Sequence, residues 1–267
     1  MANKKLTRIL SIDGGGIRGV IPGQVVVQLE KKLQKFSGNP HARVSEYFDL
    51  MAGTSTGGIL TCVYLCPDDD DPKKSRFSAS DAVDLYNKKG GRIFDLPFLH
   101  KLRTAGGVFD EKYPAGTMEE LLKEYFGEIK LSQLIKPCLI TAYEITRRAA
   151  YFFTQLDAAK HEGFDFLVCD VARATSAAPT YFEAIKILSV SGVPYTLVDG
   201  GVFANNPAMC AYSEARKIVF DEHRVKPTAA EMLILSLGTG YTRKPYKHEK
   251  AKDWGAVQWI KPIIDKL

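Results

Sequence analysis

Several features that would fix a class of function are missing from this chain of 267 residues. It has no apolar run of about 18 residues or more, so we expect no membrane-spanning helix. The stretch Met1–Leu10 has basic residues but neither the apolar core nor the cleavage site of a secretory signal peptide. The net charge of +5 is modest and dispersed, which argues against nucleic acid as a partner but is compatible with an anionic membrane surface.

Cysteine is scarce, and its five copies are an odd number: Cys62, Cys66, Cys138, Cys169 and Cys210. They stand within apolar runs, which predicts buried free thiols in a reducing compartment. Cys62 and Cys66 would share a helix face, but no nearby histidine or cysteine completes a metal site. No calcium-loop pattern is present either, so we expect no metal and no cofactor. The thiols and the missing signal peptide together predict a cytoplasmic protein.

The most informative stretch is Phe48–Leu60, in which a short apolar run ends in Gly53-Thr-Ser-Thr-Gly57 and an apolar, helix-like segment follows. Gly53 and Gly57 frame Ser55 in the G-x-S-x-G pattern of a nucleophile elbow, which needs a strand, a sharp turn and a helix. Ser55 would stand at the helix N-terminus, where free amides and the helix dipole favour a developing negative charge. So short a pattern also arises by chance in turns without chemistry, so the rest of the chain must supply a base and an oxyanion site.

A second glycine-rich turn lies between a predicted first strand at 6–12 and a predicted helix that runs to about Phe36. Gly14-Gly-Gly-Ile-Arg-Gly19 matches the dinucleotide fingerprint G-x-G-x-x-G. We reject that cofactor, because the fingerprint needs an acidic residue at the end of the next strand, and here the next strand ends at Ser55. A glycine-rich turn before a helix also suits another anion, the tetrahedral oxyanion of acyl transfer.

Predicted strands and helices alternate along the chain. After the elbow, strands are expected at 137–145, with 150–154 as its returning partner, at 195–203 and at 232–240; helices are expected at 56–65, from Ser80, at 118–126, at 166–176, from Asn205-Asn206-Pro207 and at 254–267. The alternation predicts an α/β fold with a mostly parallel sheet and helices on both faces. The length suits a single domain over residues 1–267.

The segment Lys88–Arg103 interleaves five basic residues with apolar side chains such as Phe94 and Phe98. Its two glycines and one proline argue against a regular element. One interpretation is an irregular insertion that covers the core. The other is a mobile lid or interfacial surface that presents apolar and cationic groups to phospholipid.

A serine hydrolase usually needs a histidine base, and none of the five histidines lies at a strand end or in a glycine-rich turn: His41, His100, His161, His223 and His248. Asp199 fits better, because it ends a predicted buried strand, where parallel-sheet enzymes build their sites. Alternatively, Asp199 only initiates its own Asp-Gly-Gly turn. A free carboxylate with a pKa near 3.9 is a weak base for taking the proton of a serine, although burial makes it a stronger one because it raises the pKa.

Three motifs stand in the order and contexts of the patatin-like phospholipases: Asp13-Gly-Gly-Gly-Ile-Arg-Gly19, Gly53-Thr-Ser-Thr-Gly57 and Asp199-Gly-Gly201. The chain strongly resembles that family of lipid acyl hydrolases from about Leu6 to its final residues. Four further stretches share the likeness: Ser176-Ala-Ala-Pro-Thr-Tyr-Phe182, Asn205-Asn-Pro-Ala208, Leu235-Ser-Leu-Gly-Thr-Gly240 and Pro262-Ile-Ile-Asp265.

The resemblance implies a three-layer α/β/α fold of modified α/β-hydrolase type and a Ser–Asp dyad without histidine. Ser55 would be the nucleophile and Asp199 the base that takes its proton. The amides of Gly14, Gly15 and Gly16 would hold the oxyanion.

Arg18 stands where the family has a basic residue, which would fix the glycine turn or bind lipid phosphate. The chain ends at Pro262-Ile-Ile-Asp-Lys-Leu267, where members of the family continue, so we expect either a truncated chain or one without a regulatory tail. Unlike the plant storage members it has no secretory signal, which indicates a bacterial-type intracellular enzyme.

The expected function is hydrolysis of fatty-acyl esters of phospholipids, lysophospholipids or galactolipids, with transient, peripheral contact between the protein and the membrane. Two alternatives stay open. One is an acyltransferase or thioesterase on the same scaffold, because an alcohol or thiol can capture an acyl-enzyme as water does. The other is a non-catalytic storage or lipid-binding protein that keeps the motifs.

Overall fold

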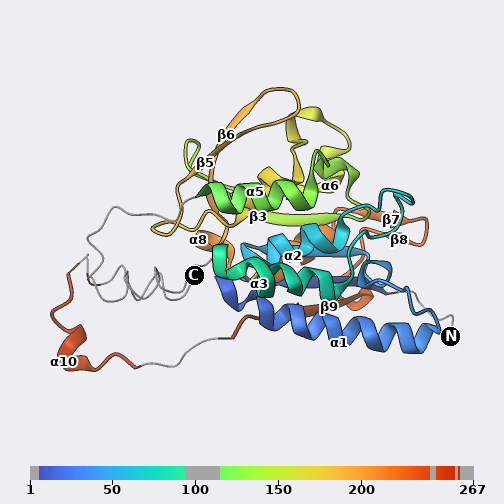
Figure 1. The fold of residues 1–267 in the computed structure, drawn as a ribbon, viewed down its shortest axis with the longest axis horizontal. Helices are drawn as coiled ribbons and strands as arrows, with labels where there is room; N and C mark the ends of the chain where they lie inside the picture. The colour runs from blue at the N-terminus through green and yellow to red at the C-terminus, as the bar shows by residue number, and fades with distance from the viewer. Residues whose placement is uncertain (1–5, 94–114, 241–244, 256–257, 259–267) are drawn as a thin grey trace.

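A computed structural model describes residues 6–93, 115–240, 245–255 and 258 of the chain (Figure 1). Its strands are β1 (Thr7–Ile12), β2 (Leu50–Thr54), β3 (Cys138–Glu144), β4 (Ala149–Thr154), β5 (Ile185–Leu188), β6 (Pro194–Asp199), β7 (Val219–Asp221), β8 (Arg224–Val225) and β9 (Met232–Leu237). Seven of them form one sheet in the order β5-β6-β3-β2-β1-β9, with β4 also paired to β3, whereas β7 and β8 form a separate hairpin.

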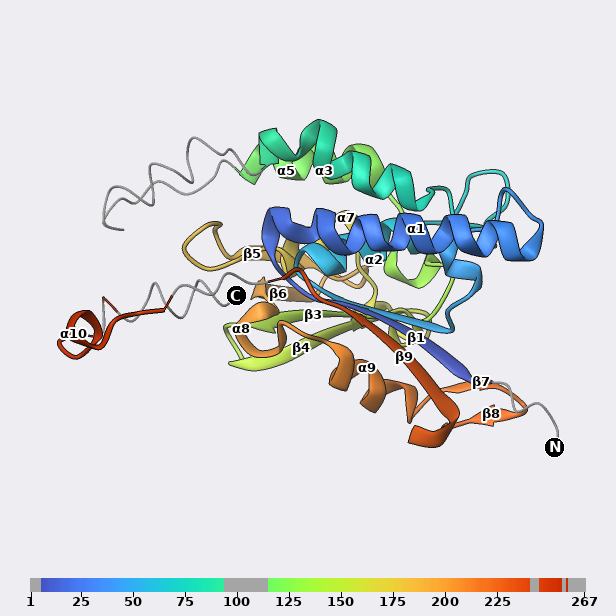
Figure 2. The ribbon, with the colours of Figure 1, turned by 90° about the horizontal axis from the view of Figure 1, so that it is seen from below.

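Helices cover both faces of this sheet. The α-helices of the described residues are α1 (Val20–Ser37), α2 (Thr56–Leu65), α3 (Ala79–Ile93), α5 (Ala115–Phe126), α6 (Gln155–Ala158), α7 (Val168–Thr175), α8 (Gly201–Ala204), α9 (Ala208–Ala215) and α10 (His248–Ala251), and of these α10 lies away from the sheet (Figure 1). Figure 2 shows α1, α2, α3, α5 and α7 on one face and the short helices α8 and α9 on the other. The predicted α/β architecture with helices on both faces is therefore confirmed.

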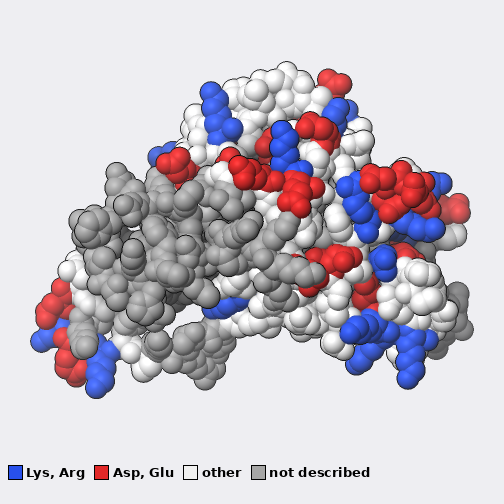
Figure 3. Space-filling view, viewed as in Figure 1, with Lys and Arg blue, Asp and Glu red and all other residues white. Residues whose placement is uncertain are grey.

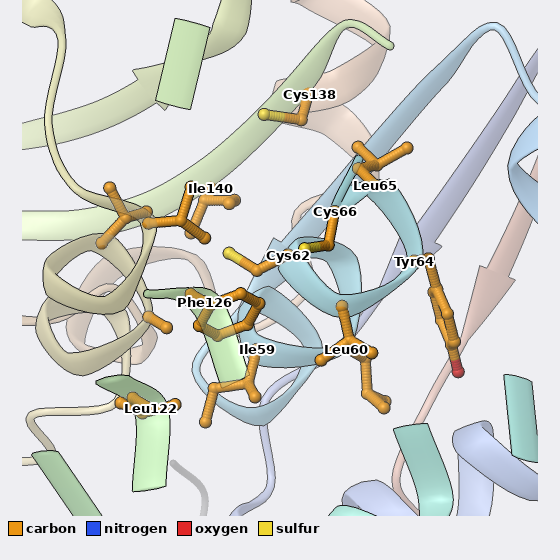
Figure 4. Packing of buried hydrophobic residues seen from close by; sticks show 14 of the residues in the cluster. Ile59, Leu60, Cys62, Tyr64, Leu65, Cys66, Leu122, Phe126, Cys138 and Ile140 are labelled. Carbon is orange, nitrogen blue, oxygen red and sulfur yellow. The ribbon is translucent and has the colours of Figure 1, made fainter. Parts of the chain in front are cut away.

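The core follows from the alternation of side chains along the strands. Along β1, Leu10 and Ile12 join the larger apolar cluster under α1 and α2, whereas Ile9 points to a smaller cluster under α9. Every residue of α2 is buried, as expected for a helix that is apolar all round. Figure 4 shows its Cys62 between Cys138 of β3 and Phe126 of α5.

The central strands β9, β1, β2 and β3 run parallel, as predicted, and β4 returns antiparallel to β3. The remaining edge of β3 is shared by two strands. Its first half pairs in parallel with β2, up to Thr54 opposite Thr141, and its second half pairs antiparallel with β6, from Asp199 opposite Ala142. Because β2 and β6 approach from opposite directions, their carboxyl ends meet against consecutive residues of β3.

This arrangement corrects one expectation, because Asp199 ends an antiparallel strand rather than a parallel one. The strand β9 is also less buried than predicted: it lies at the edge of the sheet with β1 as its partner, and Leu233 is 56% exposed. Strand β5 and the hairpin β7–β8 had no counterpart among the predicted elements. Pro207 precedes α9 as its cap rather than occupying its first position.

Two predicted segments fall largely outside the described residues. Helix α3 continues through both glycines to Ile93, so the first part of Lys88–Arg103 is helical where the sequence argued against a regular element. The rest of that segment lies outside the described residues, as does most of the predicted helix at 254–267. Within the described parts of the chain, no helix is both long enough and apolar enough to cross a membrane.

Candidate active site

Ser55 occupies a sharp bend between β2 and α2, with φ 54° and ψ −122°. Such a conformation is strained for a residue with a side chain and is typical of functional sites. A carbon added to Gly53 would lie 2.2 Å from the carbonyl oxygen of Gly57, and one added to Gly57 would lie 2.1 Å from that of Ile12. Both glycines therefore permit backbone contacts that a side chain would block, and the bend has the predicted strand–turn–helix context.

Three buried threonines tie this bend to its surroundings. The Ser55 amide donates to the hydroxyl of Thr175 on α7 at 2.9 Å, and that hydroxyl donates to the Thr141 carbonyl on β3 at 2.7 Å. The Thr141 hydroxyl donates to that of Thr54 at 2.8 Å, which in turn donates to the Ala204 carbonyl at 2.7 Å. The chain of hydroxyls connects the serine to the turn that follows Asp199.

Asp199 is 4% exposed, and its carboxyl group lies close enough to the Ser55 side chain for Ser55 to lower its pKa. Its Oδ1 also accepts a hydrogen bond of 2.7 Å from the Gly201 amide, and its own amide donates to the Ala177 carbonyl at 3.0 Å. Burial raises the pKa of Asp199 to about 6, and the Ser55 side chain and the hydrogen bond from the Gly201 amide only partly oppose that rise. At neutral pH the group is therefore a carboxylate that is more basic than one in water.

The glycine turn after β1 lies directly against Ser55, because a carbon added to Gly14 would be 3.3 Å from the Ser55 Cβ. The Gly14 amide is not free for an oxyanion, since it donates to the Asn205 carbonyl at 3.0 Å. This corrects the expectation that all three glycine amides take part. The amides of Gly15 and Gly16 have no acceptor among the described residues, so they are the two that remain for an anion.

Arg18 binds the turn itself. Its Nε donates to the Gly15 carbonyl at 3.4 Å, and Nη1 donates to the Gly240 carbonyl at 3.2 Å. These contacts are those of a residue that fixes the turn, the first of its two expected roles. Lipid phosphate remains a hypothesis for the rest of the guanidinium group.

The threonines of the site, including Thr239, which donates to the Gly14 carbonyl, were not predicted from the sequence. A lone threonine in an apolar strand indicates β-branched packing, so its role is visible only when distant segments meet. The signals in the sequence were the motifs Gly53–Gly57, which contains Thr54, and Leu235–Gly240, which contains Thr239.

Histidine, metal-ligand and cysteine chemistry have little support among the described residues. The described histidines, His41, His161, His223 and His248, are all exposed, and His100 lies outside the described residues. Over the described ranges, no group of three or more His, Cys, Asp or Glu side chains could hold a metal ion. All five cysteines are free, four of them are buried as predicted, and burial raises the pKa of the Cys138 thiol to about 12.

Charge at the surface is mixed. On the face drawn in Figure 3, the acidic and basic side chains of the described residues are interspersed rather than separated into areas of one sign. This agrees with the modest net charge of +5.

Comparison with known proteins agrees with the motifs. The family model described as patatin-like phospholipase matches residues 10–212. The chain is 34% identical over 282 residues to patatin-like protein 2 of Oryza sativa subsp. indica, covering 98% of this chain and 69% of that protein. It is 32% identical over 270 residues to a Solanum tuberosum protein named probable inactive patatin-3-Kuras 1, covering 97% of this chain and 70% of that protein.

Among solved structures, the crystal structure of VipD from Legionella pneumophila is similar with a TM-score of 0.40 and 12% identity. The similarity covers 93% of this chain and 52% of VipD, so this chain spans about half of that protein. A likeness this weak carries no argument about function.

Proposed function

The chain belongs to the patatin-like phospholipase family, and from this premise we propose that it is a lipid acyl hydrolase in which Ser55 attacks an ester carbonyl and Asp199 is the base. The substrates would be fatty-acyl esters of phospholipids, lysophospholipids or galactolipids. The observation that carries the proposal is the buried carboxyl group of Asp199 beside Ser55, and burial raises the pKa of that group to about 6.

In the first half of the reaction, the Ser55 Oγ bonds to the carbonyl carbon and its proton passes to the Asp199 carboxylate. The carbonyl oxygen becomes an oxyanion beside the amides of Gly15 and Gly16, which have no other acceptor among the described residues. The ester C–O bond then breaks, Asp199 returns the proton to the leaving alcohol, and an acyl-enzyme remains.

In the second half, water takes the place of the alcohol. Asp199 accepts a proton from the water as its oxygen bonds to the acyl carbon, and a second oxyanion forms at the same amides. Collapse of this intermediate breaks the bond to Ser55, which recovers its proton from Asp199, and the fatty acid is released. The raised pKa of Asp199 helps both steps, because a carboxylate in water is a poorer base.

The replacements Ser55→Ala and Asp199→Ala test this proposal. Each is expected to abolish ester hydrolysis, because the first removes the nucleophile and the second its base. The measurement is mass spectrometry of the fatty acids and lysolipids released from a mixed lipid extract, with circular dichroism as the control for folding. Near wild-type turnover by Asp199→Ala would show that another group is the base.

One relative is named as probably inactive, so a non-catalytic lipid-binding protein is the rival to consider. The two are separated by covalent labelling with a fluorophosphonate, which requires a nucleophilic serine. Labelling that Ser55→Ala abolishes supports the hydrolase, and unlabelled wild-type protein supports the rival. Adding an alcohol or thiol acceptor to the lipid assay then distinguishes hydrolysis from acyl transfer, since only transfer yields a new ester or thioester.

A further inference from the structure

The turn that follows β9 lies beside the glycine turn that follows β1. The two strands are parallel, with Ile12 opposite Leu237, so both turns begin at the carboxyl ends of neighbouring strands. Thr239, in the second turn, is 4% exposed, and its hydroxyl donates to the Gly14 carbonyl at 2.8 Å. A carbon added to Gly15 would lie 2.2 Å from the Thr239 Oγ1, so the two turns are in direct contact. The matched family model ends at residue 212 and does not reach Thr239.

The bond to the Gly14 carbonyl has a consequence for the next amide. The Gly14 carbonyl and the Gly15 N–H belong to one planar, trans peptide unit, so they point in opposite directions. A hydrogen bond that holds the carbonyl oxygen therefore also sets the direction of the Gly15 N–H. That amide is one of the two left without an acceptor among the described residues.

The second free amide is held in the same way. The Gly15 carbonyl, which shares its peptide unit with the Gly16 N–H, accepts hydrogen bonds from the Arg18 amide at 3.1 Å and from the Arg18 Nε at 3.4 Å. Each anion-binding amide is thus oriented by a donor on the carbonyl that precedes it: Thr239 for Gly15, and Arg18 for Gly16.

Such support is needed because glycines flank both peptide units. Without Cβ atoms, the Gly14–Gly15 unit can rotate at little steric cost, which would change the direction of its N–H. The other side-chain donor to the Gly14 carbonyl, the Asn205 Nδ2, is 3.5 Å away, which is at the limit for a hydrogen bond. The Thr239 hydroxyl therefore provides the short bond to this oxygen.

We propose that Thr239 is a positioning residue for ester hydrolysis: its hydroxyl orients the Gly14–Gly15 peptide so that the Gly15 amide meets the oxyanion. The proposal rests on the proposed function, because it assumes that an oxyanion forms at Ser55. It assigns a role to a residue that touches neither the substrate nor Ser55.

Thr239→Val tests it, because valine keeps the branched shape and loses the hydroxyl. We expect kcat on a soluble short-chain ester to fall roughly 10-fold with KM nearly unchanged, less than the roughly 10²- to 10³-fold cost of deleting an oxyanion donor. Affinity for a trifluoromethyl ketone, whose adduct with Ser55 carries an oxyanion, should fall by a similar factor. Thr239→Ser, which keeps the hydroxyl, should restore both.

The matched control is Thr7→Val, the same exchange at a buried threonine at the opposite end of β1, which should leave both quantities unchanged. Wild-type kinetics for Thr239→Val would overturn the proposal, as would a loss that Thr239→Ser shares. A fall in kcat that comes with a raised KM and a lowered unfolding midpoint would overturn it too. Failure of the proposed function is distinct, because it would leave wild-type protein inactive or Ser55→Ala active.

Discussion

The environment of the Asp199 carboxyl group disfavours its ionised form. The group is almost fully buried and has no cation among its hydrogen-bond partners in the described structure. The Ser55 side chain and the hydrogen bond from the Gly201 amide lower its pKa, but burial outweighs them and raises it to about 6. As a result, the group both loses its proton at neutral pH and takes one up more readily than an exposed aspartate. These are the two properties that a base in a dyad without histidine needs.

The first prediction is a fall in kcat/KM on a soluble ester as the pH drops through about 6, because the protonated form of Asp199 cannot accept a proton. Organic cosolvent should move the midpoint to higher pH, since ionisation of a carboxyl group creates charge, whereas loss of a proton from imidazolium does not. Rate profiles with and without cosolvent measure both. A midpoint that moves down in cosolvent would point to a histidine.

Burial of Asp199 also affects stability. Its pKa is raised in the folded state from the ordinary value of 3.8, so the folded protein binds more protons between pH 3.8 and about 6. The free energy of unfolding therefore decreases as the pH rises through that interval, and the loss is complete above it.

The second prediction follows: Asp199→Asn, which keeps the shape and an acceptor for the Gly201 amide, should raise the free energy of unfolding at pH 8 by about 1–3 kcal/mol. The gain should shrink toward zero as the pH falls to about 4. Urea unfolding at several pH values measures it. The variant should be inactive throughout, and an equal gain at every pH would assign the effect to packing instead of charge.

For single residues, the sequence was informative where the role of a residue depends on its own chemistry and on the turn in which it stands. Ser55 between its glycines and Asp199 before Gly200 could be proposed as site residues from the chain alone. The occupied amide of Gly14 could not be, because its acceptor is the Asn205 carbonyl, far away along the chain. The same holds for Thr175 and Thr239, whose partners are backbone groups of other elements.

Among the elements, α7 has a specific role through Thr175. The hydroxyl of this residue accepts from the Ser55 amide and donates to the Thr141 carbonyl, with both groups buried. Without it, a backbone donor in a strained bend and a strand carbonyl would both lose their partner. Buried backbone groups without partners are costly, so α7 stabilises the bend as well as covering the sheet.

The third prediction is that Thr175→Val lowers the free energy of unfolding by about 1–3 kcal/mol, the cost of leaving a buried polar group unpaired. Hydrolysis should slow as well, because the bend that presents Ser55 loses its support. Thr175→Ser keeps the hydroxyl and should retain most of both properties. Unfolding curves and kcat of the wild type and the two variants measure both effects. An unchanged unfolding midpoint for the valine variant would contradict the assigned role.

Elements with a strong local pattern were placed correctly from the sequence, including β1, β2, α2 and β3. The direction of β6 was not, because pairing between β3 and β6 joins residues more than fifty positions apart. Edge strands were the weakest case. Strand β5 is short and alternates only in part, and β9 has an apolar run that predicts burial although only one of its sides is paired.

Across the whole molecule, the two ends of the central sheet differ. Ser55 and Asp199 lie where β2 and β6 end, whereas an ion cluster lies at the start of β2, beside the β7–β8 hairpin. There, Arg224 of the β7–β8 hairpin contacts Asp49 and Asp221 at 2.8 Å each, and Asp49 accepts a hydrogen bond from the Arg8 amide. The side chains of Arg224 and Asp49 are 9% and 12% exposed, so these charges are largely removed from water.

The fourth prediction is that Arg224→Ala lowers the free energy of unfolding by about 1–3 kcal/mol, because it removes a largely buried cation that lies 2.8 Å from Asp49 and from Asp221. Ester hydrolysis at low temperature should be unchanged, since the cluster lies at the opposite end of β2 from Ser55. Arg216→Ala, at the exposed arginine that follows α9 as its C-cap, is the matched control and should change stability little. Lost activity in a folded Arg224→Ala protein would show that the two ends are coupled.

Strand β3 also acts as the common reference for both members of the proposed dyad. Since Thr54 and Asp199 face consecutive residues of one strand, a slip of β6 by a single residue would displace Asp199 by about 3.3 Å and turn its side chain to the other face of the sheet. An insertion or deletion within β6 would therefore separate Asp199 from Ser55. Relatives that hydrolyse esters by this mechanism are thus expected to keep the pairing of β3 with β2 and β6 more strictly than the length of the surrounding loops.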